Sequence, residues 1–381
     1  MNHAATRTER LDAAGHEPRA QRTAMQSAEH TAEQTAEHTA EDTRCSAQGA
    51  DAPAGRAVVS VAHDADEQAR NLVGWRQTYD QLAAGRFVGT LTEIPLDTMK
   101  VFCETTSHTL RQACEVRGDA YWFGIPATRG QEARIDAQPF GAEAFAMRPG
   151  NVEFELLTPA QFSIYGVVVR GEVLRHYAQT VEGVALDARL PQTPIVRAGA
   201  ARLAHLCGVL EQRLDDDDDD HVDGEVARSA RSPLSDAERN DVQAEMLAAL
   251  FDACVQHGND RDGESARQTP EQASRRRWIV AQAREYVLAH RSRPVGVPEL
   301  CEQLLVSRRT LQYCFQDVLG MAPATYLRAV RLNGARRDLC GREAGSVQDV
   351  AAAWGFWHLS QFATDYRRMF GMRPSEARRA S

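Results

Sequence analysis

Apolar side chains recur with a helical period in two stretches near the end of the chain. In the first stretch, one face of a helix at about 100° per residue carries Leu311, Cys314, Phe315 and Val318. The opposite face carries Arg309, Gln312, Tyr313 and Gln316. Ser307 is a good N-cap and Gly320 a good C-cap, and Pro323 prevents continuation. The pattern predicts a short helix at 297–304 followed by an amphipathic helix that ends at Gly320.

The same pattern returns 51 residues later in the chain. This offset aligns Gly320-Met321-Ala322-Pro323 with Gly371-Met372-Arg373-Pro374, Leu311 with Phe362, Phe315 with Tyr366, Val318 with Met369, Leu300 with Ala351, Cys301 with Ala352 and Leu305 with Phe356. Ser346 caps a predicted short helix at 347–354, Gly355 forms the turn, and a longer helix follows at 358–370. Asp365 lies at the margin of its apolar stripe and fits the pattern poorly. We therefore expect two helix-turn-helix units, joined by a helix at 326–340.

Short apolar and aromatic runs of strand type fill the first half of the chain. An opening helix is expected at 66–82, and strands are expected at 88–94, 98–104, 120–125, 152–157 and 162–169. Turn signals such as Arg148-Pro149-Gly150-Asn151 separate these runs. Strands at this spacing favour a small barrel or jelly roll. Tyr121, Trp122 and Phe123 are interpreted as core residues, with a ligand pocket as the alternative.

Composition divides the chain into four parts and gives an α+β fold class. Residues 1–60 contain almost no large apolar side chains and are expected to be a disordered, low-complexity tail. Residues 61–195 form the β-rich domain, and 275–381 form the all-α domain with two helix-turn-helix units. Between them, 196–274 contains linker helices at 198–214 and 236–257, separated by the aspartate run 215–220. Such a run favours a solvated segment over a metal site.

Charge and cysteine usage narrow the function classes. Residues 274–381 contain 18 Arg, no Lys and 9 Asp or Glu, so this segment carries +9 while the whole chain carries −9. The C-terminal segment is therefore suited to a polyanion. The eight cysteines show neither a C-x-x-C pair nor zinc-ligand spacing, which indicates buried thiols in a reducing cytoplasm. We expect a cytoplasmic protein with no membrane span, no metal and no cofactor.

Residues 278–379 resemble the DNA-binding domain of the AraC/XylS family of transcription regulators. The resemblance rests on Ser307-Arg308-Arg309-Thr310-Leu311, Phe315, Gly320-Met321-Ala322-Pro323, Tyr326-Leu327-Arg328, Arg331-Leu332, Val350-Ala351, Gly355-Phe356, Ser360-Gln361-Phe362 and Phe370-Gly371-Met372-Arg373-Pro374-Ser375. It implies a sequence-specific regulator whose two units read successive major grooves of a double-stranded operator. An activator is the expected type, although the sequence does not separate activation from repression.

The resemblance also implies which side chains meet DNA. In the first unit, the expected contacts are Arg308, Arg309, Gln312, Tyr313 and Gln316. In the second unit, they are Trp357, His358, Leu359, Ser360, Gln361, Ala363, Thr364 and Arg367. Trp357 and His358 either touch DNA or pack against the joining helix. Because the donors of the second set are weaker, we expect the first unit to carry more of the base discrimination.

Trp354-Gly355-Phe356-Trp357-His358 and the stretch 151–159 look like the ethanolamine-utilisation operon regulators within this family. The family's N-terminal halves sense a small molecule or support dimerisation, and the β-rich segment is similar to a cupin-like sensor that lacks the His-x-His metal motif. Expected partners are the operator, RNA polymerase, a small-molecule effector and a second copy of the chain.

Two enzyme hypotheses are alternatives to the regulator. A DNA alkyl-transfer repair protein with this type of domain needs an activated cysteine, yet Cys45 stands alone in the polar N-terminal part. A DNA-cutting enzyme needs carboxylates from separate elements around two metals, which the run 215–220 does not supply. We therefore expect no catalytic residues.

Overall fold

The computed structural model describes residues 57–128, 130–186, 193–215, 234–254, 270–341 and 345–380. These ranges belong to one compact unit, Pro53–Ser381. Residues 1–56 of the expected disordered tail, Cys45 and the aspartates at 216–220 lie outside the described residues. Residues 58–60 were also expected to belong to the tail, but they form the start of strand β1 (Val58–Ala62).

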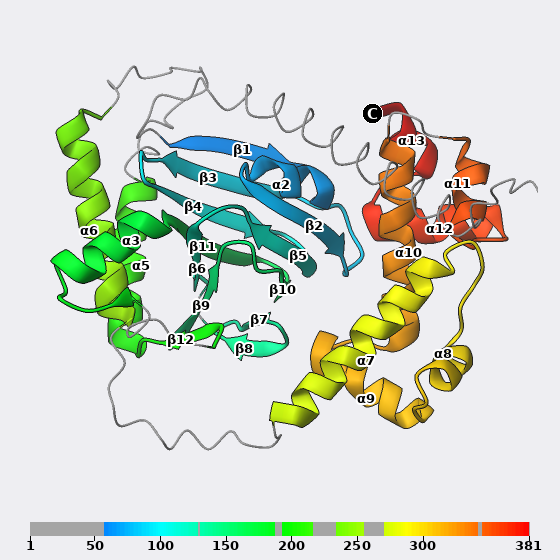
Figure 1. The fold of residues 1–381 in the computed structure, drawn as a ribbon. Coiled ribbons are helices and arrows are strands. Elements are labelled where there is room, and N and C mark those ends of the chain that lie inside the picture. The colour runs from blue at the N-terminus through cyan, green and yellow to red at the C-terminus, as the bar shows by residue number, and fades with distance from the viewer. Residues whose placement is uncertain are drawn as a thin grey trace, which may run out of the picture. The chain divides into compact units, whose positions relative to one another are not determined.

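Two antiparallel sheets form the N-terminal part (Figure 1). The first sheet has the strand order β1 (Val58–Ala62), β3 (Gly89–Pro95), β4 (Met99–Thr106), β11 (Phe162–Arg170), β6 (Ala120–Pro126), β9 (Ala144–Pro149) and β12 (Ile195–Arg197). The second sheet has the order β2 (Trp75–Gln81), β5 (Leu110–Val116), β10 (Phe154–Thr158), β7 (Ala133–Ile135) and β8 (Gln138–Phe140). The α+β layout expected from the sequence is confirmed.

Alternation along β6 shows how the layers pack. Trp122 is buried between the two sheets and stacks on Phe154, with ring centroids 4.9 Å apart. Its neighbour Phe123 is buried on the other face, among the helices α3 (Gly171–Thr180), α5 (Ala200–Asp215) and α6 (Asp236–Cys254). Successive residues of a strand point to opposite faces, so one run serves two cores. Trp122 and Phe123 are thus core residues, as expected, and Tyr121 packs partly buried beside Phe123's cluster.

The expected helix at 66–82 is wrong over most of its length. Helix α2 (Ala65–Asn71) ends early, Gly74 adopts φ +91°, and the remainder is strand β2. Trp75, Thr78 and Tyr79 are residues that favour strands, and the whole segment pairs with β5. The apolar spacing was compatible with a helix, but pairing with a strand some thirty residues later decided the structure.

Strand β5 was not predicted, because its polar residues conceal its position. Arg111 and Gln112 are buried together with Leu110, since the second sheet is covered on both faces. The first sheet covers one face, and the C-terminal helices approach the other through Leu157 and Ala137. A strand buried on both faces loses the alternation that identifies it in a sequence.

The C-terminal part is helical throughout its described elements. Its helices are α7 (Pro270–Ala289), α8 (Val297–Gln303), α9 (Arg308–Leu319), α10 (Pro323–Cys340), α11 (Val347–Ala353), α12 (Leu359–Phe370) and α13 (Pro374–Ala380). The two helix-turn-helix units are α8–α9 and α11–α12, and α10 joins them. Helices α9 and α12 begin and end 51 residues apart, and both end at a left-handed glycine, Gly320 at φ +70° and Gly371 at φ +71°.

Upstream of the turns, the offset between the two units is 50 residues rather than 51. The amide of Val306 donates to Cys301 O, and that of Phe356 donates to Ala351 O. The positive φ that makes each turn is found at Leu305 and at Gly355. The expected pairing of Leu300 with Ala351 and of Leu305 with Phe356 is therefore wrong by one position, because the second turn contains one more residue.

Helix α10 also joins the helical part to the sheets. The Asn333 side chain lies against the end of β2: Gln81 N–H donates to Asn333 Oδ1 at 3.0 Å, and Asn333 Nδ2 donates to Gln81 O at 2.9 Å. The end of α12 is held in the same region, since Gly85 N–H and Gln81 Nε2 both donate to Met369 O. The described sheets and helices thus share one continuous interface.

Candidate DNA-binding surface

Helix α9 presents the polar face that its sequence predicts. Leu311, Cys314, Phe315 and Val318 are buried, whereas Arg308, Arg309, Gln312, Tyr313 and Gln316 are exposed. The Ser307 hydroxyl accepts from Thr310 N–H at 3.0 Å, which caps the helix where the exposed face begins. The expected division between inward and outward faces is confirmed, and contact of these residues with DNA remains a prediction.

Arg309 and Tyr313 are arranged as a pair on this face. The Arg309 guanidinium donates to Tyr313 Oη at 3.1 Å and lies 5.4 Å from the centre of its ring. The side chain of Tyr313 is 55% exposed, so the pair is accessible from solvent. Stacking on an aromatic ring restricts the arginine, which lowers the entropy lost when it binds a base or a phosphate.

The polar groups of α12 are used more within the protein. Gln361 Nε2 donates to Asp365 at 3.0 Å, and the Thr364 hydroxyl donates to Ser360 O at 2.9 Å. Leu359, Ser360, Gln361, Thr364 and Arg367 are exposed, and Ala363 is half-buried. The second helix therefore offers fewer uncommitted donors than the first.

Asp365, which fits the amphipathic pattern poorly, has a partner outside its own helix. Arg328 of α10 pairs with it at 3.2 Å. The Asp365 carboxylate therefore lies where α12 meets α10, and the Arg328 guanidinium compensates its charge. Arg328 is itself largely exposed beside α12. It lies within the family motif Tyr326-Leu327-Arg328, but it is not among the residues expected from the sequence to contact DNA.

Trp357 and His358 lie at the start of α12 and are both exposed. Trp357 is 73% exposed, so its packing against the joining helix, the alternative left open by the sequence, is wrong. Trp354 fills that place instead and donates its indole N–H to Asp338 of α10. The apolar ring of Trp357 is therefore exposed to solvent next to α12, which is the predicted reading helix of the second unit, the helix expected to enter the major groove.

The supporting helix of the second unit is fixed by a capping box. The Ser346 hydroxyl accepts from Asp349 N–H at 3.1 Å, and Ser346 N–H donates to the Asp349 carboxylate at 3.1 Å. These bonds hold the pKa of Asp349 below its ordinary value, so the cap keeps its charge further into the acidic range. The side chain of His358 does not cap α12, so the first backbone amides of that helix donate no hydrogen bond to it.

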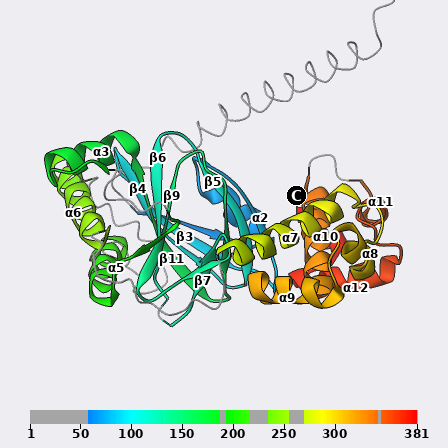
Figure 2. The ribbon, with the colours of Figure 1, turned by 60° about the horizontal axis from the view of Figure 1, so that its bottom comes forward.

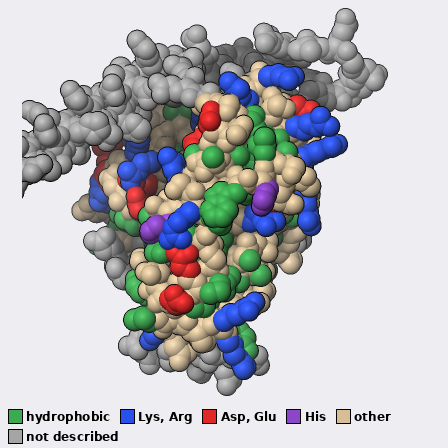
Figure 3. Space-filling model, turned by 90° about the vertical axis from the view of Figure 1, so that its right-hand side faces the viewer, with side chains coloured by type: hydrophobic (Ala, Val, Ile, Leu, Met, Phe, Trp, Pro, Cys, Tyr) green, Lys and Arg blue, Asp and Glu red, His purple; other side chains and the backbone are tan. Residues whose placement is uncertain are grey.

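The two predicted reading helices share an edge of the molecule. In Figure 2, α9 and α12 lie along the same edge of the helical part, with α10 between them. Figure 3 shows one side of the molecule, on which groups of basic side chains lie among apolar ones and a few acidic ones. Part of the +9 charge is not available there, because Arg331 and Arg336 are buried and Arg284 and Arg337 pair with Asp80.

Two features are absent from the part of the chain that the structure describes. Within those ranges, no group of three or more His, Cys, Asp or Glu side chains is placed to hold a metal ion. No helix in the same ranges has the length and apolar character needed to cross a bilayer.

Known proteins resemble the region of the chain that carries this surface. Residues 300–380 match the family described as helix-turn-helix domain. The probable thc operon regulatory protein of Rhodococcus erythropolis is 39% identical over 100 residues, which are 26% of this chain and 30% of the relative. The transcriptional activator RhaS of Yersinia pestis is 28% identical over 159 residues, 40% of this chain and 52% of the relative. The chain thus spans about a third to a half of the length of these relatives.

A solved structure from Chromobacterium violaceum, described as a transcriptional regulator with an AraC-type DNA-binding domain, is 29% identical. It covers 28% of this chain and 94% of its own, with a TM-score of 0.26. The helix-turn-helix match and the regulatory relatives agree with the resemblance of residues 278–379 to the AraC/XylS DNA-binding domain. The relatives belong to other operons, so the resemblance to ethanolamine-utilisation regulators is not confirmed.

Proposed function

We propose that the whole protein is a sequence-specific transcription regulator that binds a double-stranded operator through α9 and α12. The observation that carries the proposal is the repeat itself: two reading helices with the same length, the same left-handed glycine ends and outward polar faces. Adjacent major-groove segments on one face of B-DNA recur every ~34 Å, so two joined units suit neighbouring turns.

The two helices have different tasks in this proposal. Arg308, Arg309, Gln312, Tyr313 and Gln316 read base edges and phosphates from α9. Trp357 to Gln361, with Ala363, Thr364 and Arg367, supply apolar, shape and phosphate contacts from the second unit. This division is supported by the engagement of Gln361 and Thr364 inside α12.

The N-terminal sheets form the sensor in this proposal. Their two-layer antiparallel arrangement is compatible with a cupin-like jelly roll that takes a small-molecule effector. We further propose contact with RNA polymerase, activation of transcription in the cytoplasm, and association with a second copy of the chain. The alkyl-transfer alternative is not favoured, since the named relatives are regulatory proteins.

Selection of bound fragments from genomic DNA tests the proposal. The purified full chain should enrich a small set of sites, and affinity for them should fall steeply as salt rises. Arg175→Ala, at an exposed position in the N-terminal part, is the control and should select the same sites. Equal recovery of unrelated fragments, or an affinity that does not change with salt, would refute sequence-specific binding through the basic helices.

A further inference from the structure

A groove of about 510 Å³ runs along one flank of the first reading helix, between α9 and the first half of α7. The side chains that line this flank groove come from three elements: Gln272, Arg275, Arg276 and Ile279 from α7, Thr310, Tyr313, Cys314, Gln316 and Asp317 from α9, and Arg134 from β7. Tyr313 and Gln316 also belong to the exposed face that is expected to read bases. The flank groove is therefore continuous with that face.

The lining of the flank groove is positively charged. It contains three guanidinium groups and one carboxylate, that of Asp317, so its net charge is +2. Arg276 pairs with the Asp317 carboxylate at 3.0 Å, and Arg134 donates to the backbone oxygen of the same residue. Within the described residues, neither Arg134 nor Arg275 has a carboxylate partner. These two arginines therefore keep their charge for an anion outside the protein.

The flank groove lies on the outer side of the first unit. In Figures 1 and 2, β7 and the first turns of α7 lie on the side of α9 that faces away from α12. If α9 and α12 enter neighbouring turns of the major groove, the direction from α12 to α9 follows the axis of the duplex. The flank groove then meets the phosphates just beyond the segment that α9 reads.

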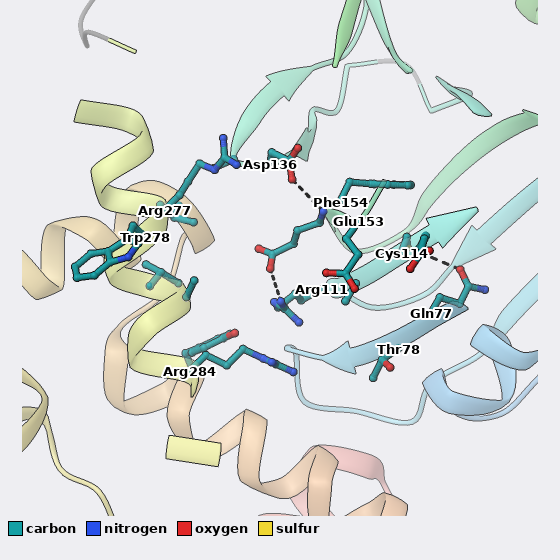
Figure 4. A pocket seen from close by; sticks show the side chains of 18 of the residues that line it. Gln77, Thr78, Arg111, Cys114, Asp136, Glu153, Phe154, Arg277, Trp278 and Arg284 are labelled. Atoms are coloured by element: carbon teal, nitrogen blue, oxygen red, sulfur yellow. Dashed lines mark hydrogen bonds and ion pairs between the residues drawn. The ribbon is translucent and has the colours of Figure 1, made fainter. Parts of the chain in front are cut away.

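The run Arg275-Arg276-Arg277 divides its charges between two sides of α7. Successive residues of a helix point about 100° apart, so three consecutive arginines cannot all face one groove. Arg275 and Arg276 line the flank groove, whereas Arg277 extends toward the second sheet at a different cavity (Figure 4). Arg277 is therefore a residue of the same type, in the same helical turn, that lies outside the flank groove.

We propose that the flank groove binds operator phosphates beyond the outer edge of the segment read by α9, with Arg275 and Arg134 as their partners. Guanidinium groups form charge-assisted, bidentate hydrogen bonds with phosphate oxygens. The inference rests on the proposed function and deepens it, because Arg134 belongs to the β-rich part of the chain. That part then contributes directly to operator affinity, while the bases are read elsewhere.

The length of the operator tests the proposal with the full chain. One duplex ends at the outer boundary of the first unit's segment, and a second extends it there by roughly 5 base pairs, half a helical turn. The segment that disappears from the footprint of Arg309→Ala with Gln312→Ala identifies this end. Fluorescence anisotropy at fixed salt should show about threefold or more tighter binding of the extended duplex. The same extension beyond the second unit should give a smaller gain.

Variants assign this gain in affinity to the flank groove. Arg275→Gln and Arg134→Gln should each reduce the gain, and each should lower the slope of log affinity against log salt by about 1. Arg275→Lys should keep most of the gain, because an ammonium group also pairs with phosphate. Arg277→Gln is the matched control and should keep the wild-type gain. Equal gains at the two ends, or a full gain in both glutamine variants, would overturn the proposal.

The two proposals fail in different ways. Arg275→Gln should select the same sequences as the wild type, because a phosphate contact carries no base preference. Failure of the wild type to select any sites would refute the regulator. Selection by the wild type without a gain from the outer extension would refute the flank groove alone.

Discussion

The indole of Trp354 lies directly against the Cα of Gly334, where an added Cβ would come within 2.0 Å of the ring. Gly334 is in the middle of α10, where glycine costs about 1 kcal/mol relative to alanine. The position tolerates this cost because the tryptophan of the second unit needs the space. This contact holds the second helix-turn-helix unit to the joining helix.

Gly334→Ala should therefore destabilise the protein by about 1–3 kcal/mol, since overpacking outweighs the gain in helix propensity. Chemical denaturation followed by tryptophan fluorescence measures the change. Gly208→Ala in α5 is the matched control, because an added Cβ there meets nothing within 4 Å and should be neutral or slightly stabilising. A stabilising effect at both positions would show that Trp354 does not occupy this place.

Arg309→Ala should weaken binding to a selected operator by about 1–3 kcal/mol and relax the preference at one base position. The expectation follows from the exposed pair that Arg309 forms with Tyr313. Fluorescence anisotropy at fixed salt, with operators changed one base pair at a time, measures both effects. Uniform weakening on every sequence would assign Arg309 to a phosphate instead of a base.

Tyr313→Phe isolates the contribution of the pair to that binding. It keeps the ring under the guanidinium and removes the hydroxyl that accepts from Arg309. A loss smaller than that of Arg309→Ala is expected, because stacking is retained. A larger loss would mean that the Tyr313 hydroxyl itself contacts DNA.

Burial raises the pKa of Glu104 to about 7, against an ordinary value of 4.5, despite hydrogen bonds from Gln68 and Tyr79. Between these values the folded protein binds more protons than the unfolded chain, so the free energy of unfolding falls as pH rises toward 7. Glu104→Gln removes this dependence and should stabilise the protein at pH 8 by roughly 2–4 kcal/mol.

Denaturation of both proteins at pH 5 and pH 8 measures the difference. Glu285→Gln, at an exposed position on α7, should leave the pH dependence of the wild type unchanged. If Glu104→Gln retained the full wild-type slope, another group would be responsible for it.

Asp80 links the sheets to the helices through three guanidinium groups. It pairs with Arg337 at 2.7 Å and with Arg284 and Arg111 at 3.6 Å. Burial would raise the pKa of Asp80, but these arginines outweigh it and hold the pKa below its ordinary value. Asp80→Asn leaves the arginines without their shared counter-ion, so a loss of about 3–5 kcal/mol in the free energy of unfolding is expected.

Asp97→Asn is the control for that substitution. Asp97 pairs with Arg239 at 3.1 Å but is half exposed, and an exposed pair contributes about 0–1 kcal/mol. Similar losses in the two variants would show that burial does not set the strength of the Asp80 cluster.

The sequence was most informative where several local signals coincided. The helical period of the apolar residues, the capping residues and the internal repeat all predict α9 and α12. The bounds and outward faces of these two helices were therefore predicted closely. The turns were misaligned by one residue, because Leu305 adopts a positive φ that a sequence assigns to glycine. The segment of β2 was predicted to be helical because its pairing with β5 depends on tertiary contacts, which the local sequence does not show.

The interface between sheets and helices had only a weak local signal. Asn333 and Gln81 are 252 residues apart, and Asp80 meets Arg337 over a similar separation. One Asn and two Arg are buried in α10, and such buried polar side chains could have indicated the interface. Their partners become apparent only when the fold is known.

Hydroxyl-radical footprinting of the protein on a selected operator tests the central claim most directly. Two protected segments about 10 base pairs apart on one face of the duplex are expected, one for each reading helix. Arg309→Ala with Gln312→Ala should erase one segment, and Ser360→Ala with Arg367→Ala should weaken the other. A single protected segment, or loss of both segments in either variant together with an intact fold, would contradict two units reading neighbouring turns.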